Sequence, residues 1–220
     1  MSSSRSFGRA FGAVATVSLV AVVLAVGASA RSLAAPNLLK NGGADLGEGV
    51  NHVNGIVTSI PGWTRSGSFT VVKYGAPGGF PELAVSKKIG GKVNFFAGGP
   101  SNPRSGATQV VDVSRFKSAI GAGKRMATLS GLLGGYASQE DSLTVTATFL
   151  SAAGKKLGVL KIGPVTAGQR KSETTFLQKS ASKPVPKATR SILVKLTAAR
   201  TSGSYNDGYA DSLALRLAAT

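Results

Sequence analysis

The sequence predicts an all-β, antiparallel β-sandwich, and two patterns lead to this prediction. From Pro36 to the end, short runs alternate apolar and polar residues, which is the period of a strand with one buried face. Between the runs, glycine, proline, serine and asparagine recur about every eight to twelve residues, as in sandwiches and barrels. The part beyond the first segment of about thirty residues has the size of one ordinary domain, so we expect a single core.

The strands with the clearest alternation lie in the second half of the chain. Leu143–Phe149 places its apolar residues on one face and its threonines on the other, and Arg190–Thr197 repeats this arrangement. The last strand places Leu213, Leu215 and Leu217 on one face, which we expect to be buried. Weaker strands are expected at residues 69–73, 92–97, 107–112, 126–133 and 157–162.

Only one short segment favours a helix. Ser114 is a candidate N-cap, and Phe116 and Ile120 have the i, i+4 spacing of one helical face. Residues 98–106 and 179–189 are rich in loop-forming residues and are expected to be long surface connections.

The N-terminus has the pattern of a signal-peptide helix. Arg5 and Arg9 precede an apolar run over residues 10–26, and Ala-Ser-Ala at residues 28–30 is the small-x-small pattern that signal peptidase cuts. We expect residues 1–30 to be removed. An uncleaved membrane anchor is the alternative, although the run falls short of the roughly 20 residues that span a bilayer.

Cleavage after Ala30 leaves residues 31–220 as one secreted, extracellular domain, for which the cell wall is a candidate location. It removes two of the 26 Lys and Arg residues, so 24 remain against 9 Asp and Glu, a formal charge of +15. Such a field favours anionic wall polymers, acidic glycans or lipid headgroups, and a surface that serves only solubility is the alternative. The charges are scattered along the sequence, so specific nucleic-acid binding is not expected.

The residue inventory argues against catalysis. The chain has no cysteine, which excludes thiol catalysis and Cys-ligated zinc, and its only histidine, His52, lies in a Gly/Asn-rich stretch. No serine has a nucleophile-elbow context, so a Ser-His-Asp triad is not expected. Two distant carboxylates could still hydrolyse a glycoside, but the adjacent Glu140 and Asp141 are more typical of a polar turn. We therefore expect no enzyme activity.

One carboxylate has an unusual position. Asp211 shares its parity with Tyr209 and with the three leucines of the last strand, so strand alternation places it on the core side. A buried carboxylate is costly unless it is paired, hydrogen-bonded or bound to a metal. Calcium suits it, because this ion takes carboxylate and carbonyl oxygens in irregular geometry. The alternative is a position near the rim, where Asp211 accepts hydrogen bonds from loop amides.

Three motifs together resemble the galactose-binding-like jelly-roll superfamily, which includes many carbohydrate-binding modules. They are Asn37-Leu38-Leu39-Lys40-Asn41 near the start, Ile60-Pro61-Gly62-Trp63 soon after, and Tyr205-Asn206-Asp207-Gly208-Tyr209-Ala210-Asp211-Ser212-Leu213 near the end. The resemblance implies a jelly-roll sandwich. It also implies a structural calcium ion between an N-terminal acid and the acid of the last strand, which correspond here to Asp45 and Asp211. The usual Phe-Glu of the family is replaced by Ala44-Asp45.

The resemblance and the missing catalytic groups predict a secreted, noncatalytic module that binds carbohydrate or a cell-surface polymer. Such modules often stack sugars on exposed aromatic rings, and Tyr136, Tyr205 and Asn206 are the candidate ligand-binding residues. Tyr205 and Tyr209 flank Asn206-Asp207-Gly208, a sequence typical of a turn. The alternative is a basic envelope or adhesion protein that binds anionic polymers by charge and has no sugar pocket.

Overall fold

The computed structural model describes residues 1–3 and 35–220. The expected signal peptide falls almost entirely on residues 4–34, so it lies outside the described residues. Among the residues described, no helix is long and apolar enough to cross a membrane. Residues 35–220 form one compact unit.

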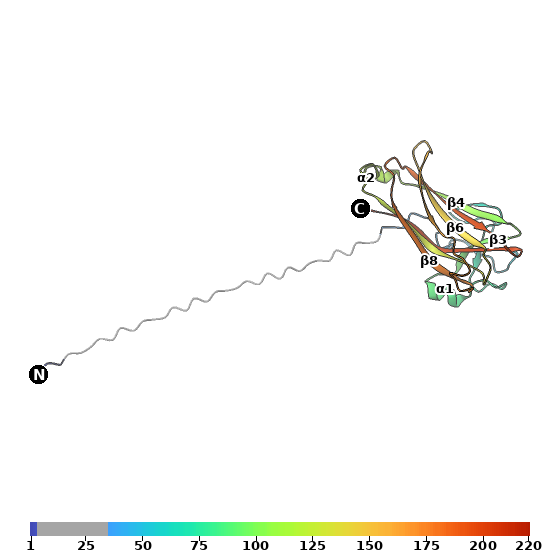
Figure 1. The fold of residues 1–220 in the computed structure, drawn as a ribbon, viewed down its shortest axis with the longest axis horizontal. Coiled ribbons are helices and arrows are strands. Elements are labelled where there is room, and N and C mark those ends of the chain that lie inside the picture. The colour runs from blue at the N-terminus through green and yellow to red at the C-terminus, as the bar shows by residue number, and fades with distance from the viewer. Residues whose placement is uncertain (4–34) are drawn as a thin grey trace. The chain divides into compact units, whose positions relative to one another are not determined.

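This unit is a sandwich of two five-stranded sheets (Figure 1), which confirms the predicted fold class. One sheet has the order β1-β4-β9-β6-β7 and the other β2-β3-β10-β5-β8, and neighbouring strands pair antiparallel. The strands are β1 (Thr64–Ser66), β2 (Thr70–Lys73), β3 (Asn94–Pro100), β4 (Arg104–Asp112), β5 (Met126–Gly135), β6 (Ser142–Leu150), β7 (Lys156–Ile162), β8 (Thr175–Pro184), β9 (Ser191–Ala199) and β10 (Tyr205–Ala218). The helices are α1 (Leu83–Ile89), the 3-10 helix η1 (Ser114–Phe116) and α2 (Lys117–Gly121).

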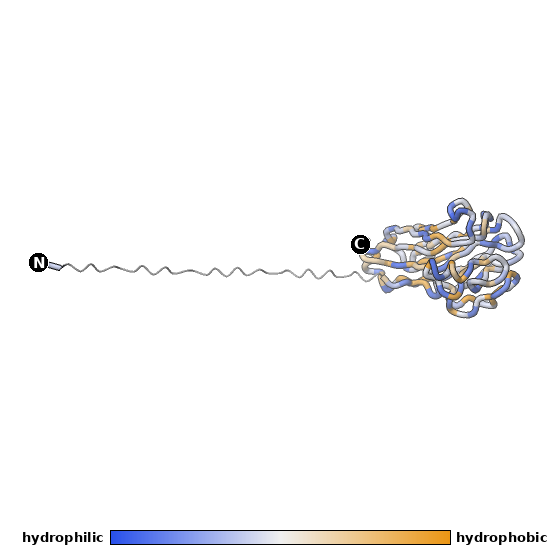
Figure 2. Tube along the Cα trace, turned by 90° about the horizontal axis from the view of Figure 1, so that it is seen from below, coloured by the Kyte–Doolittle hydropathy of each residue, from blue (hydrophilic) through white to orange (hydrophobic). Residues whose placement is uncertain are grey.

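The main core lies between the two sheets. The alternating apolar residues of β6 and β9 point into it, as the sequence pattern predicts. Trp63 packs edge-on against Phe96 with ring centroids 5.7 Å apart, and its indole nitrogen donates to the Asn41 carbonyl. Figure 2 shows apolar and hydrophilic stretches alternating along the described chain. Burial of the inner face of each strand therefore holds the two sheets together.

The prediction of long surface connections at residues 98–106 and 179–189 was wrong in part. Residues 175–184 form β8, which pairs along its whole length with β5, so only residues 185–190 connect β8 to β9. Between β3 and β4, only residues 101–103 are outside strands. Gly98 and Gly99 belong to β3, where the Asn206 side chain and the Ser68 backbone leave no space for a Cβ. These glycines therefore permit close packing and do not mark a loop.

The predicted helix over residues 114–120 is confirmed as η1 followed by α2. The helix α1 was not predicted. It is seven residues long, has no side-chain N-cap, and ends at Gly90 in the left-handed conformation. Its short length leaves too little periodicity for sequence detection.

The parity argument for the last strand was wrong, although Asp211 is buried. The pairing of β10 with β5 shifts register between Asp211 and Ala214, and Ser212 has a φ of 50°. This β-bulge changes the side to which the following residues point. Leu213 consequently faces the core between the sheets, while Tyr209 faces the opposite side of β10.

Candidate functional site

The two sheets differ in what lies on their outer faces. The sheet containing β10 is covered by a second apolar cluster, contributed by its own strands and by the connection from β2 to β3. The buried members are Val72, Tyr74, Ala76, Phe80, Phe95, Ala97, Leu132, Phe176, Tyr205 and Tyr209. Phe95 lies at the centre, with ring centroids 4.9 Å from Tyr74 and 5.1 Å from Tyr209. Beneath this cluster the sheet is thus buried on both faces, whereas Thr128 and Ser182 are accessible farther along β5 and β8.

The sheet containing β9 leaves its outer face uncovered. We name this surface the open face and define it by the outward residues of β4, β9, β6 and β7. They are Thr108, Val110, Leu193, Lys195, Thr197, Thr144, Thr146, Thr148, Val159 and Lys161. All ten are at least partly accessible, and Val110 is 65% exposed. The open face is a continuous strand surface that the fold leaves available to a ligand.

Side chains that lie opposite one another on neighbouring strands form two rows across the open face. Thr108, Lys195, Thr146 and Lys161 are consecutive partners on the four strands and make a polar row. The adjacent row, Val110, Leu193, Thr148 and Val159, is mainly apolar. With strands about 4.8 Å apart, each row spans about 14 Å. The polar row can donate and accept hydrogen bonds, and its two lysines can neutralise acidic groups.

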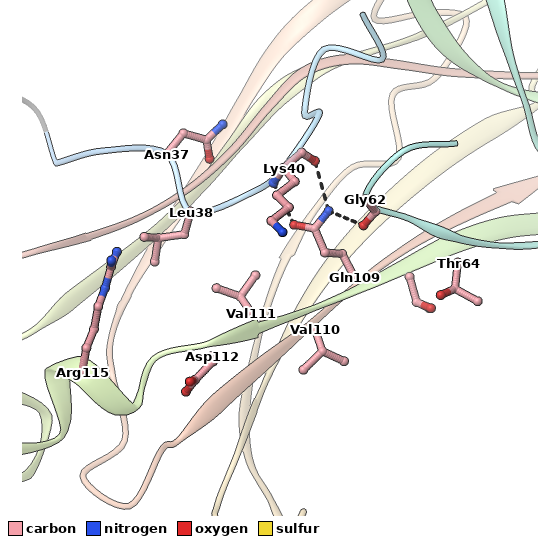
Figure 3. Close-up of a pocket in the computed structure, with 11 residues that line it drawn as sticks. Asn37, Leu38, Lys40, Gly62, Thr64, Gln109, Val110, Val111, Asp112 and Arg115 are labelled. Carbon is pink, nitrogen blue, oxygen red and sulfur yellow. Dashed lines mark hydrogen bonds between the residues drawn. The ribbon is translucent and has the colours of Figure 1, made fainter. Parts of the chain in front are cut away.

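A groove of about 660 Å³ follows the β1–β4 edge of the open face (Figure 3). Gln109 lies at its floor and is nearly buried. Its amide oxygen accepts from the Lys40 amide at 2.9 Å, and its amide nitrogen donates to the carbonyls of Lys40 and Gly62 at 3.0 and 2.7 Å. Gln109 therefore ties the N-terminal segment to β4, and Arg115 lines the far part of the groove.

The structure brings Asp45 and Asp211 together, although they are far apart in the sequence. Oδ2 of Asp45 and Oδ1 of Asp211 both approach Gly43, where a Cβ would lie 2.7 and 3.5 Å from them. Asp45 accepts from the amides of Val93 and Asn94 through Oδ1. Asp211, which is 1% exposed, accepts from the Tyr74 hydroxyl through Oδ2 at 2.8 Å.

Burial raises the pKa of Asp211 to about 6, and the charge of Asp45 adds to the shift, while the hydrogen bonds from Tyr74 and Ser212 oppose it. Two facing carboxylates fit a calcium ion, which would relieve their repulsion. Within residues 35–220, no group of three or more His, Cys, Asp or Glu side chains could hold a metal. The remaining ligands of an ion here would therefore be carbonyl oxygens and water.

Of the candidate ligand residues, Tyr205 and Asn206 lie in β10 of the covered sheet, and Tyr136 directly follows β5. Tyr205 packs against Phe80 with ring centroids 5.2 Å apart, and Asn206 is fully buried over Gly98. Both belong to β10, so the Asn206-Asp207-Gly208 sequence is part of a strand and not a turn. Tyr136 is half-buried and packs on Gly79. Of the three side chains, only Tyr136 has a partly accessible ring.

Sequence reasoning missed a buried arginine in the same part of the molecule. Arg170 is 2% exposed and donates to the carbonyls of Ala137, Gln139 and Glu173. It thereby fastens the β5–β6 connection, which carries Tyr136, to the connection before β8. An arginine in a loop gives no sequence signal of burial, because its partners are backbone carbonyls.

Asp207 and Asp141 stabilise the start of β10. Asp141 accepts from the amides of Thr201 and Asp207 at 2.6 and 2.9 Å. Asp207 accepts from the Tyr209 hydroxyl. Burial raises the pKa of Asp207 to about 6, and the Tyr209 hydrogen bond acts in the opposite direction.

No protein-family model matches this chain, and no curated protein matches it. Several solved structures do match. The enzymatically active domain of tailspike protein 4 from bacteriophage CBA120 has a TM-score of 0.50 and 12% identity, over 84% of this chain and 21% of that chain. The present chain thus spans about a fifth of that tailspike structure.

Two carbohydrate-binding modules also match. A family 16 module has a TM-score of 0.48 and 17% identity over 81% of this chain and 99% of that chain. The xylan-binding CBM22-1 domain from Paenibacillus barcinonensis Xyn10C has a TM-score of 0.42 and 14% identity over 75% of this chain and 90% of that chain. Both matches are likenesses of fold at low sequence identity. Because the matches include binding modules and an enzyme domain, they identify a fold and not an activity.

Proposed function

We propose that this chain is a secreted, noncatalytic module that binds carbohydrate on its open face. The observation that supports the proposal is the difference between the two sheets: one is covered by an aromatic cluster, and the other offers the polar row to solvent. The groove beside Gln109 extends this surface at the β4 edge. A sheet that is held rigid from behind gives a ligand a preorganised surface, which lowers the entropic cost of binding.

The proposed mode of recognition is hydrogen bonding supported by charge. Among the described residues, the aromatic side chains are buried except for Phe116 and Tyr136, and neither lies on the open face. Thr146 and Thr108 can exchange hydrogen bonds with sugar hydroxyls, and Lys195 between them can bind a hydroxyl or an acidic group. The open face thus favours a glycan recognised by its hydroxyls over one recognised by ring stacking.

The test is a double substitution with a matched control on the other sheet. T146V removes a hydroxyl at constant shape, and K195Q removes the charge of its neighbour in the polar row. The control T175V/K179Q makes the same residue changes at half-buried positions of β8, away from the open face. We expect the first variant to reduce binding in a panel of soluble polysaccharides at least tenfold and the control to bind normally. Equal binding by both variants would contradict the proposal.

We also propose that calcium binds between Asp45 and Asp211 and stabilises the fold. Calcium requires ionised carboxylates, so its stabilising effect should decline as the pH falls below about 6, where Asp211 takes up a proton. D211A should abolish the rise in melting temperature that calcium causes. Equal melting temperatures of the unmutated protein in calcium and in chelator would contradict this part of the proposal.

The charge-driven alternative remains a second candidate. The described residues contain one ion pair, between Lys73 and Glu48 at 3.6 Å. Most lysines and arginines therefore keep their charge uncompensated. High salt separates the two candidates, because it weakens charge-driven binding to a polymer and leaves hydrogen bonding to a neutral sugar largely intact.

A further inference from the structure

Positive charge that is scattered along the sequence gathers at one end of the fold. Three connections form this end, namely residues 113–125, 151–155 and 185–190. Backbone hydrogen bonds hold them together: Val113 to the Arg190 carbonyl at 3.0 Å, Arg190 to that of Leu150 at 2.8 Å, and Val185 to that of Arg125 at 2.9 Å. In Figure 1, α2 marks this end of the sandwich, and α1 lies at the opposite end.

We name this surface the basic end. Its cations are Arg115, Lys117, Lys124, Arg125, Lys155, Lys187 and Arg190 of the three connections, together with Lys156 and Lys183 at the adjoining ends of β7 and β8. Arg125 and Arg190 are half-buried and the others are exposed. The connections also approach one another through these side chains, since Cε of Lys187 lies 3.8 Å from the Cβ position of Gly123.

Within the described residues, Asp112 is the only Asp or Glu in the three connections or directly flanking them. It accepts a hydrogen bond from the Ser114 amide at 2.8 Å, which lowers its pKa and keeps it ionised but occupied. The one ion pair of the described chain, Lys73 with Glu48, lies elsewhere. Asp112 offsets one positive charge, since it interacts with Arg115, and the other like charges of the basic end repel one another, which opposes folding and is relieved by a bound polyanion.

A cavity of about 540 Å³ opens within the basic end. Its polar lining consists of Ser114, Ser151, Ser191, Lys117, Arg190 and Asp112. Three hydroxyls and two cations suit a tetrahedral oxyanion, because a phosphate group presents several strong acceptor oxygens. The cavity can hold one such group while neighbouring lysines contact the next groups of a chain.

We propose that the basic end binds a linear, phosphate-bearing polymer of the cell envelope. The basic end shares no residue with the open face, although Arg115 also lines the groove beside Gln109, so the inference goes beyond the proposed glycan binding. A polymer fits better than a bilayer, because membrane-surface binding combines charge with apolar insertion. The large exposed apolar residues of the described chain, such as Leu83 and Val110, lie outside the three connections of the basic end.

The experiment compares two triple variants with equal loss of charge. K117Q/K124Q/K187Q neutralises the basic end, and K87Q/K88Q/K171Q neutralises three exposed lysines elsewhere. Residues 31–220 are used, since every described strand and both core clusters lie within them. Binding to inorganic polyphosphate and to vesicles containing phosphatidylglycerol is measured from 50 to 500 mM salt, after circular dichroism has shown equal folding.

We expect the unmutated protein to bind polyphosphate with an affinity that falls linearly on a log-log plot against salt. Each lost lysine should weaken binding about fivefold, so the basic-end variant should bind polyphosphate with about 100-fold lower affinity. The slope of its log affinity against log salt concentration should decrease in magnitude by about 2. The control should lose less than about fivefold. Equal losses in both variants, absence of polyphosphate binding, or binding to vesicles alone would each overturn the proposal. Glycan binding by the T146V/K195Q variant tests the open face independently.

Discussion

The two sheets share one core but have opposite relations to solvent. The sheet containing β10 carries an aromatic cluster on its outer face, and the sheet containing β9 carries threonines and lysines there. Their sequences differ accordingly: β3 is buried at every position, whereas β9 alternates buried and accessible residues. The comparison indicates that one sheet serves stability and that the other is available for binding.

The largest expected effect separates the sheets by stability. F95A should lower the free energy of unfolding by about 3–5 kcal/mol, because the ring is fully buried among four other aromatic rings. L193A on the open face should cost about 1 kcal/mol, since Leu193 is only half-buried. Urea unfolding of both variants measures the difference, and comparable losses would refute the division between the sheets.

Arg170 provides a second test on the covered side. R170A leaves three carbonyls without their donor and should cost about 2–4 kcal/mol. Its exposed neighbour offers a matched control, and K171A should change stability by less than about 0.5 kcal/mol. If thermal unfolding gives the two variants the same stability, Arg170 does not fasten the connections as the contacts indicate.

The buried carboxylates of β10 predict a pH dependence. The folded pKa values of Asp207 and Asp211 are about 6, above the ordinary value of 3.8, so folding favours their protonated forms. Their contribution to stability is complete below about pH 3.8 and is lost as the pH rises through 6. The loss should be about 3 kcal/mol for each group. In chelator, D207N/D211N should flatten this part of the stability profile, and an unchanged slope between pH 4 and 7 would argue against the raised pKa values.

The smallest stability effect is expected on the open face. T146V/K195Q should alter the free energy of unfolding by less than about 0.5 kcal/mol, because both side chains point to solvent. Its effect on glycan binding should nevertheless exceed that of T175V/K179Q. A large destabilisation measured by urea unfolding would show that the open face has a structural role.

Alternation sufficed to predict the sandwich and the strands β4, β9, β6 and β7, because β6 and β9 have one buried face each; the short β1 was not predicted. Alternation failed at β8, where Gln178-Lys179-Ser180 gives no apolar pattern and pairing with β5 decides the conformation. Alternation also failed at Ser212. A β-bulge there changes the side of β10 on which Asp211 lies relative to the leucines that follow, and the periodicity of the sequence gives no sign of it.

The same limit applies to the sites. The juxtaposition of Asp45 and Asp211 was predicted through the family resemblance, whereas the burial of Tyr205 depends on the cluster around Phe80. The basic end could not be predicted, because its lysines come from three connections that are distant in the sequence. The paired ends of β4, β6 and β9, and those of β5 and β8, bring the connections together.

The most direct test of the open face is amide chemical-shift mapping of residues 31–220 during titration with xylohexaose, cellohexaose and oligogalacturonate in 500 mM salt. The account predicts that at least one of these glycans shifts the amides of β4, β9, β6 and β7, with the largest changes near Thr146 and Lys195. Shifts confined to β5, β8 and the connection that carries α1, or no shifts with any of the three glycans, would contradict it.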